Sequence, residues 1–147
     1  MATTAKIAKD IKLEEIRRKS KAAKAEKKPA KAKADKAEAV VAAGGAISVQ
    51  VLNELTNVAR RKMQMSWSDT HAFLGMLRGL LTVHPLTIET HETGLALAER
   101  YGLSIYDAMI TASALHAGCD TLWSEDMQHG MTLKEGLRIV NPFLAAG

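Results

Sequence analysis

Acidic residues stand at three points of the sequence where a predicted helix begins or a predicted strand ends. Asp107 lies at the start of an apolar run, and Glu125 and Asp126 follow a second apolar run. Glu54 lies in the first turns of a predicted helix that follows a short apolar segment. Carboxylates gathered in one place repel each other strongly unless a divalent cation lies among them. Such hard oxygen ligands suit Mg²⁺ or Mn²⁺, which can activate a water molecule for attack on a phosphodiester.

Each of these carboxylates also has an ordinary structural explanation. Asp107 lies three residues after Ser104, and the pattern S-x-x-[DE] is that of a capping box at a helix N-terminus. Asp126 fits a solvated loop, and Glu54 fits an exposed helix face with local ion pairing. In open α/β sheets, however, ligand sites gather at the carboxyl ends of strands and at the helix N-termini beside them. From the residues alone, a capping or surface role and a shared site both remain open.

The elements that must position these residues alternate between helix and strand after about residue 40. Apolar residues with the i, i+3, i+4, i+7 spacing of a buried stripe predict helices over residues 50–63, 66–81, 90–101 and 104–117. Short apolar or β-branched runs predict strands over residues 46–49, 82–86, 120–124 and 137–140. This alternation predicts an α/β domain with a parallel sheet that helices cover on both faces.

The first 39 residues differ from the rest in composition and charge. They hold 13 Lys/Arg against 6 Asp/Glu (+7), whereas residues 40–147 hold 7 against 10 (−3), which together give the net charge of +4. A Lys/Ala-rich segment buries too little apolar surface to offset an ordering entropy of about 1 to 2 kcal/mol per residue. We therefore expect a disordered or partly helical basic tail over residues 1–39 and a domain over residues 40–147. For the tail, a solvated segment and a nucleic-acid-binding arm are both open.

The remaining composition restricts the classes of protein to consider. The single Cys119 excludes an internal disulfide framework and fits a reducing, cytoplasmic environment. The longest apolar runs are far shorter than the ~20 residues that a spanning helix needs, so we expect no membrane span. The five histidines lack the spacing of a zinc site, and no glycine loop of the phosphate-binding kind is present.

Three blocks of the sequence closely resemble the PIN-domain family, and the nearest likeness is to VapC-type toxins of bacterial toxin–antitoxin pairs. The blocks are VLNELTNVARRK at 51–62, LALAERYGLSIYDAMITASALHAGCDTLWSEDMQHG at 95–130 and LRIVNPF at 137–143. The resemblance covers roughly residues 34–143. It implies a three-layer α/β/α domain whose central parallel sheet gathers four acidic residues around one or two Mg²⁺ or Mn²⁺ ions. It also implies cleavage of single-stranded or loop RNA.

The family's acidic positions can be carried over one residue at a time. Glu54 in VLNE resembles the second family carboxylate, and Asp107 in YDA resembles the third. Asp126 in SED resembles the fourth, Ser124 is the hydroxyl that accompanies it, and Glu125 is an adjunct. The resemblance therefore implies that Glu54, Asp107 and Asp126 bind metal and act in catalysis.

Partners follow from charge and from the same resemblance. Arg60, Arg61 and Lys62 are candidate phosphate contacts by charge, and a solvated helix face explains them equally well. The resemblance implies an RNA substrate, a cognate antitoxin protein and a homodimer.

The sequence departs from the family at its beginning. PIN domains begin with an apolar strand that ends in an Asp-Thr-Asn-like motif, which supplies the first carboxylate and the central strand of the sheet. Nothing here matches this motif, and no apolar strand precedes Asp10 in AKIAKDIKLEE, so we do not assign that role to Asp10. We expect a sheet without its first strand, a metal site of three carboxylates, and impaired or absent nuclease activity. A catalytically impaired remnant whose basic tail binds nucleic acid or protein is the alternative.

Overall fold

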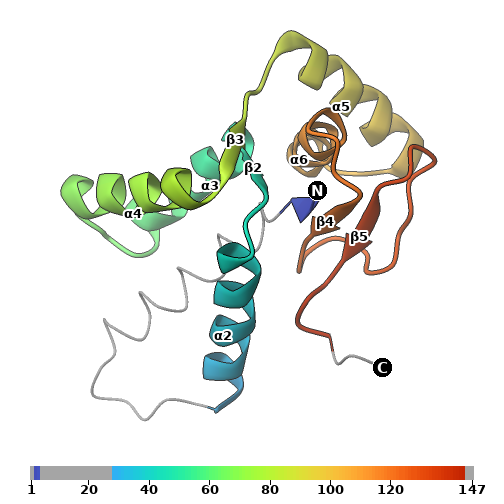
Figure 1. Cartoon of the computed structure of the whole chain (residues 1–147). Coiled ribbons are helices and arrows are strands. Elements are labelled where there is room, and N and C mark those ends of the chain that lie inside the picture. Colours follow the sequence, from blue (N-terminus) through green and yellow to red (C-terminus); the bar gives the residue numbers. More distant parts are fainter. Residues whose placement is uncertain (1, 4–27, 145–147) are drawn as a thin grey trace.

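The computed structural model describes residues 2–3 and 28–144 of the chain (Figure 1). The helices of this part are α2 (Lys28–Ala42), α3 (Val49–Arg61), α4 (Trp67–Leu80), α5 (Ile88–Tyr101) and α6 (Ile105–His116). Its strands are β1 (Ala2–Thr3), β2 (Ala46–Ser48), β3 (Thr82–His84), β4 (Thr121–Trp123) and β5 (Arg138–Val140). All helices and strands predicted between residues 46 and 140 are present. None of the described helices is long and apolar enough to cross a membrane.

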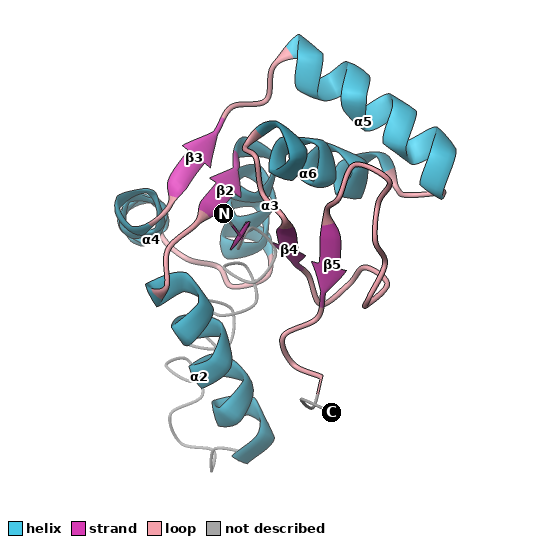
Figure 2. Cartoon of the chain, turned by 45° about the vertical axis from the view of Figure 1, so that its right-hand side comes forward, coloured by secondary structure: helices cyan, strands magenta, loops and turns pink. Residues whose placement is uncertain are grey.

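The strands form one sheet in the order β3-β2-β1-β4-β5, and every pairing between named strands is parallel, as the alternation of helices and strands predicted (Figure 2). Ile47 pairs with Val83 across β2 and β3, and Leu122 pairs with Ile139 across β4 and β5. Ile47, Leu122 and Ile139 are fully buried. Each of these three strands therefore contributes an apolar side chain to the core while its backbone groups satisfy those of its neighbours.

The central position of the sheet is occupied, so the expectation that the first strand is missing was wrong. β1 pairs with β2 through Thr3 and Ala46, and with β4 through Ala2 and Thr121 and through Thr3 and Leu122. Strand pairing uses backbone N–H and C=O groups, so two residues without an apolar sequence signal can join β2 to β4. Residues 4–27, including Asp10, lie outside the described part of the chain, and so does most of the expected tail.

Helix α2 crosses the boundary that composition suggested at residue 39. Ala34, Ala37 and Val41 have the i, i+3, i+7 spacing of one helix face and are all buried. Ala37 and Val41 belong to the hydrophobic core cluster. The small alanine side chains allow this Lys-rich helix to approach the core while its charged residues, such as Asp35 and Lys36, stay exposed. The helix is followed by Gly44, whose φ of 84° suits glycine at this turn.

Helix α6 is the most buried helix of the described chain. Seven consecutive residues, 108–114, are buried, and the helix contacts α3, α5, β2 and β4. A helix that is buried on all sides must be apolar or small on all sides, which the run Ala-Met-Ile-Thr-Ala-Ser-Ala satisfies. The polar members Thr111 and Ser113 donate hydrogen bonds back to the carbonyl groups of Asp107 and Met109 (2.8 and 2.9 Å). The N-terminus of α6, which carries Asp107, is thus held on a rigid and well-packed element.

Candidate functional site

Asp107 lies in the first turn of α6. Ser104 is the N-cap of this helix, and its Oγ accepts a hydrogen bond from the Asp107 N–H (3.2 Å). The Asp107 side chain is half-buried. The positive end of the helix dipole favours a carboxylate at this position, whether the carboxylate caps the helix or binds a ligand. Thr111, one turn later, donates to the Asp107 carbonyl and also contacts Met127 Sδ at 3.8 Å.

Asp126 lies on a tight turn that follows β4. The buried Ser124 accepts a hydrogen bond at Oγ from the Met127 N–H (3.2 Å), and its own N–H donates to the Val140 carbonyl (2.9 Å). These two bonds fix the turn at both ends and leave Asp126 exposed between them. Because Met127 also contacts Thr111, the turn lies beside the first two turns of α6. Asp107 and Asp126 therefore belong to adjacent segments. The Ser124 hydroxyl shapes the turn rather than standing free beside Asp126.

Glu54 lies in the second turn of α3, directly after β2. Ser48 ends that strand and caps the helix, because its Oγ accepts from the Val51 N–H (3.2 Å). Glu54 is half-buried, and α3 packs against α6. Helix α6, which carries Asp107, therefore contacts both α3, which carries Glu54, and the turn that carries Asp126.

These three carboxylates do not form a complete metal centre within the described residues. Among residues 2–3 and 28–144, no group of three or more His, Cys, Asp or Glu side chains is arranged so that it could hold a metal ion. The sheet order gives a physical reason. β1 lies between β2 and β4, so these two strands are separated by about 10 Å, twice the usual spacing of neighbouring strands. Glu54 follows β2 and Asp126 follows β4, so these two carboxylates come after strands that are not neighbours in the sheet. The described residues alone therefore do not fit a divalent-ion site.

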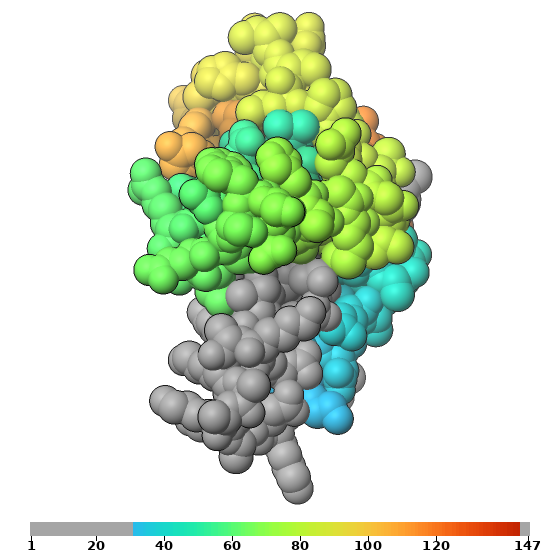
Figure 3. Space-filling view, turned by 90° about the vertical axis from the view of Figure 1, so that its left-hand side faces the viewer, coloured from blue at the N-terminus to red at the C-terminus, as the bar shows by residue number. Residues whose placement is uncertain are grey.

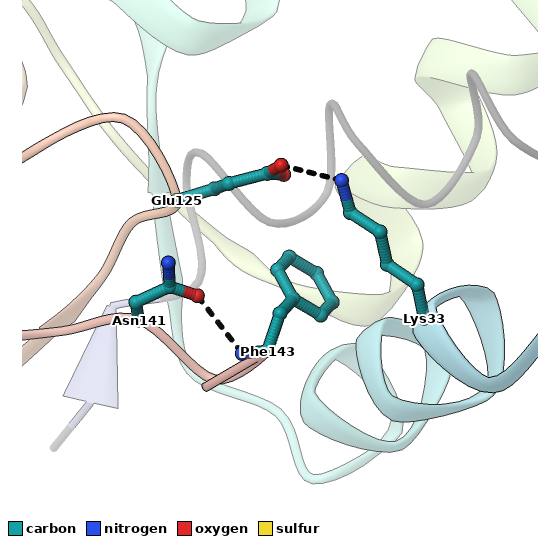
Figure 4. Close-up of polar contacts among 4 residues, drawn as sticks. All are labelled: Lys33, Glu125, Asn141 and Phe143. Carbon is teal, nitrogen blue, oxygen red and sulfur yellow. Dashed lines mark hydrogen bonds and ion pairs between the residues drawn. The ribbon is translucent and has the colours of Figure 1, made fainter. Parts of the chain in front are cut away.

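Glu125 has a partner that the sequence did not reveal. Its carboxylate forms an ion pair with Lys33 of α2, and Lys33 Nζ also lies 4.9 Å from the centroid of the Phe143 ring (Figure 4). The Phe143 N–H donates to Asn141 Oδ1 (2.9 Å), which orients the end of the chain that follows β5. Glu125 Oε2 is buried and has no hydrogen-bond partner among residues 2–3 and 28–144. Lys33 was one of 13 basic residues in a low-complexity segment, so no local pattern distinguished it.

The three basic residues at the end of α3 differ in their surroundings. Arg60 is half-buried, donates from Nη1 to the Met65 carbonyl and lies over the Trp67 ring, with Cζ 4.2 Å from the ring centroid. It therefore holds the turn between α3 and α4. Arg61 and Lys62 are exposed and available to solvent. The exposed Trp67, in the first turn of α4, joins this basic group.

Comparison with protein families gives a match to the PIN domain. The chain matches the PIN domain over residues 9–130, which is more than half of its 147 residues. The match begins well before residue 34, where the expected resemblance starts, and it includes Asp10 together with Glu54, Asp107 and Asp126. A comparison with curated proteins gave no match. The parallel α/β fold, the acidic residues at strand ends and helix starts, and this match agree, and the chain belongs to the PIN-domain family, whose members are generally nucleases.

Proposed function

We propose that this chain is an endoribonuclease of the VapC toxin type that hydrolyses RNA phosphodiesters in a reaction that depends on Mg²⁺ or Mn²⁺. The family supports nuclease chemistry in general, and the proposal adds the type, the substrate and the metal. We also propose that it acts in the cytoplasm, binds a cognate antitoxin protein and forms a homodimer. The observation that supports the proposal most directly is the contact between Thr111 and Met127, because Thr111 lies one turn after Asp107 and Met127 follows Asp126.

The chain's own residues would contribute negative charge, orientation and electrostatic contact with RNA. Asp107 and Asp126 are the acidic pair on adjacent segments, and Glu54 is the third carboxylate, on α3. Ser124 would position Asp126 through the turn that its Oγ stabilises. A divalent cation held by these carboxylates together with a ligand from outside the described residues would supply an activated water and stabilise charge on the phosphate.

The chain offers a matched control for Asp107. Ser66 caps α4 as Ser104 caps α6, and its Oγ accepts from the Asp69 N–H (3.0 Å) at the same helix position. Asp69 is exposed and lies at the start of a different helix. Asp69→Asn therefore removes a carboxylate from the same local environment without touching the candidate site.

The test uses the purified full chain, single-stranded RNA and either Mg²⁺ or Mn²⁺. We expect cleavage by the unchanged chain and by Asp69→Asn, and a loss of at least 100-fold in Asp107→Asn and Asp126→Asn, since removing one stabilising group costs about 10² to 10³ in rate. We also expect Mn²⁺ to raise the melting temperature of the unchanged chain, because a ligand that binds the native state stabilises it. Equal cleavage by Asp107→Asn and Asp69→Asn would contradict the proposal.

A second candidate function is favoured by one observation, the lack of a metal-holding group among the described residues. We propose as this alternative a catalytically impaired PIN domain whose basic tail binds nucleic acid or protein. Such a chain should cleave no RNA and show no Mn²⁺-dependent rise in melting temperature. Its affinity for RNA should instead fall steeply with salt, because Lys and Arg contacts release counterions.

A further inference from the structure

An exposed tryptophan lies beside the most basic stretch of the domain. The Trp67 surface consists of the end of α3, its C-cap residue and the first turns of α4, namely Arg60, Arg61, Lys62, Trp67 and His71. Trp67 is 56% exposed, although tryptophan is usually well buried. Figure 3 shows this face of the molecule, where the green segment that includes α4 lies at the surface without another described element over it. The ring is therefore accessible to a ligand.

Arg60 fixes the Trp67 ring in place. Its Cζ lies 4.2 Å from the ring centroid, and its Nη1 donates to the Met65 carbonyl just before α4 begins. The His71 ring lies one turn further along α4, with its centroid 6.1 Å from that of Trp67 and a tilt of 36° between the planes. A ring held by a cation–π contact loses less conformational freedom when a ligand stacks on it. The surface is thus pre-organised for stacking.

The charge of this surface is opposite to that of the domain around it. Residues 40–147 have a net charge of −3, yet three of their seven Lys/Arg residues are consecutive at positions 60–62. Between residues 60 and 71, Asp69 is the only acidic residue, so the stretch has a net charge of +2. An exposed aromatic ring beside exposed cations is the combination that binds single-stranded nucleic acid, because bases stack on the ring while the cations contact phosphates.

Helix α3 connects the Trp67 surface with the candidate site. Glu54 and Arg61 are seven residues apart, which places them on the same helix face, about 10.5 Å apart along the axis. Asn57, between them on this face, is exposed and polar. A strand bound at Trp67 can therefore extend along α3 toward Glu54 without crossing an apolar surface.

From these observations we infer that Trp67 stacks on a base of single-stranded RNA, that Arg61 and Lys62 contact its phosphates, and that Arg60 positions the ring without touching the RNA. This inference rests on the proposed ribonuclease function and adds a substrate-binding surface to it. We specify single-stranded RNA because the bases of a duplex are already stacked on neighbouring bases, so a protein ring cannot reach their faces.

The two tryptophans of the chain make a direct test possible. The full chain has only Trp67 and Trp123, and Trp123 is half-buried in β4. The probe is a single-stranded 2′-O-methyl oligonucleotide, which resists cleavage, titrated while tryptophan emission is measured. We expect quenching in the unchanged chain and none in Trp67→Phe, which retains only Trp123. We also expect Trp67→Ala to bind the probe about 5-fold to 150-fold more weakly.

The salt dependence of RNA binding distinguishes the roles of the basic residues. Arg61→Gln and Lys62→Gln should each lower the slope of log affinity against log salt by about 0.7, as expected for one lost phosphate contact to a single strand. Arg78→Gln removes the same charge from an exposed residue at the far end of α4 and should leave affinity and slope unchanged. Arg60→Gln should weaken stacking in the unchanged chain but have no further effect in the Trp67→Ala background.

The results of these titrations either support or overturn the inference. Unchanged quenching and affinity in Trp67→Ala would overturn it and would leave Trp67 as a contact for a protein partner. Equal quenching by a duplex of the same sequence would contradict the inference that the surface binds single strands. The binding assay does not depend on catalysis. Quenching without RNA cleavage would support the Trp67 surface and contradict the proposed function. Cleavage without quenching would support the proposed function and contradict the Trp67 surface.

Discussion

Lys33 and Glu125, 92 residues apart in the chain, form an ion pair that joins α2 to the turn after β4 (Figure 4). Both side chains are 30% exposed, so the pair is partly shielded from water. Glu125 is the neighbour of Asp126, and a cation on Glu125 reduces the repulsion that two adjacent carboxylates would exert on each other. The basic N-terminal segment therefore contributes a charge to the candidate site as well as a helix to the core.

Lys33→Met should destabilise the domain by about 1 kcal/mol, because it leaves the half-buried Glu125 carboxylate without its cation. Lys33→Arg should retain most of the stability. Lys36→Met, on the same helix but exposed, is the matched control and should have little effect. Urea denaturation measures the free energy of unfolding of each variant. If the ion pair is the cause, Lys33→Met should have no effect on stability in a Glu125→Gln background, which a double-mutant cycle measures.

Ser124→Ala should lower the free energy of unfolding by about 1 kcal/mol, because it deprives the Met127 N–H of its buried acceptor. Under the proposed function it should also slow RNA cleavage, since the turn that carries Asp126 loses one of its two anchors. Ser68→Ala, at an exposed position in α4, serves as the control and should change neither quantity. A stable Ser124→Ala chain with full activity would show that the hydroxyl is dispensable to the turn.

Gly94→Ala should destabilise the chain although alanine is the better helix former. A Cβ at Gly94 on α5 would clash with the flexible end of Met109 on α6, whose Sδ would lie only 2.9 Å away and whose Cε would lie nearer still. Because Met109 is itself buried, its side chain cannot move out into solvent to make room. Overpacking costs about 1 to 3 kcal/mol, which exceeds the gain of about 1 kcal/mol in helix propensity.

The control for this change is Gly75→Ala on α4, where a Cβ would meet no atom within 4 Å. There the propensity gain should act alone and raise the melting temperature. Thermal denaturation followed by circular dichroism compares the two variants. A shift of the melting temperature in the same direction in both variants would contradict the predicted clash at Gly94.

Thr3→Pro should disrupt the centre of the sheet. Proline cannot donate a backbone hydrogen bond and is excluded from central strands, and β1 lies between β2 and β4. We expect a loss of at least about 1 kcal/mol for the missing donor. Thr3→Val keeps the N–H and the β propensity and should behave like the unchanged chain. Equal stability of the proline and valine chains would mean that β1 contributes nothing to the sheet.

Local patterns in the sequence predicted most of the fold. The apolar periodicity of residues 50–63 predicted α3, and Val51, Leu55, Val58 and Ala59 are its buried residues. Helix periodicity and strand alternation reflect neighbours within one element, so they can be read without knowing the fold. The central strand could not be read in this way, because Ala2 and Thr3 pair through backbone groups that every residue has.

The candidate site shows the same division between local and tertiary information. Ser66 to Asp69 and Ser104 to Asp107 have the same pattern, and both form the same capping hydrogen bond. The sequence determined that each aspartate starts a helix. Only the tertiary structure decided that α6, through Thr111 and Met127, brings one of them beside the turn of Asp126. Likewise, only packing selected Lys33 from 13 basic residues as the partner of Glu125, because a contact between distant segments depends on where the chain folds back and leaves no periodic signal in the sequence.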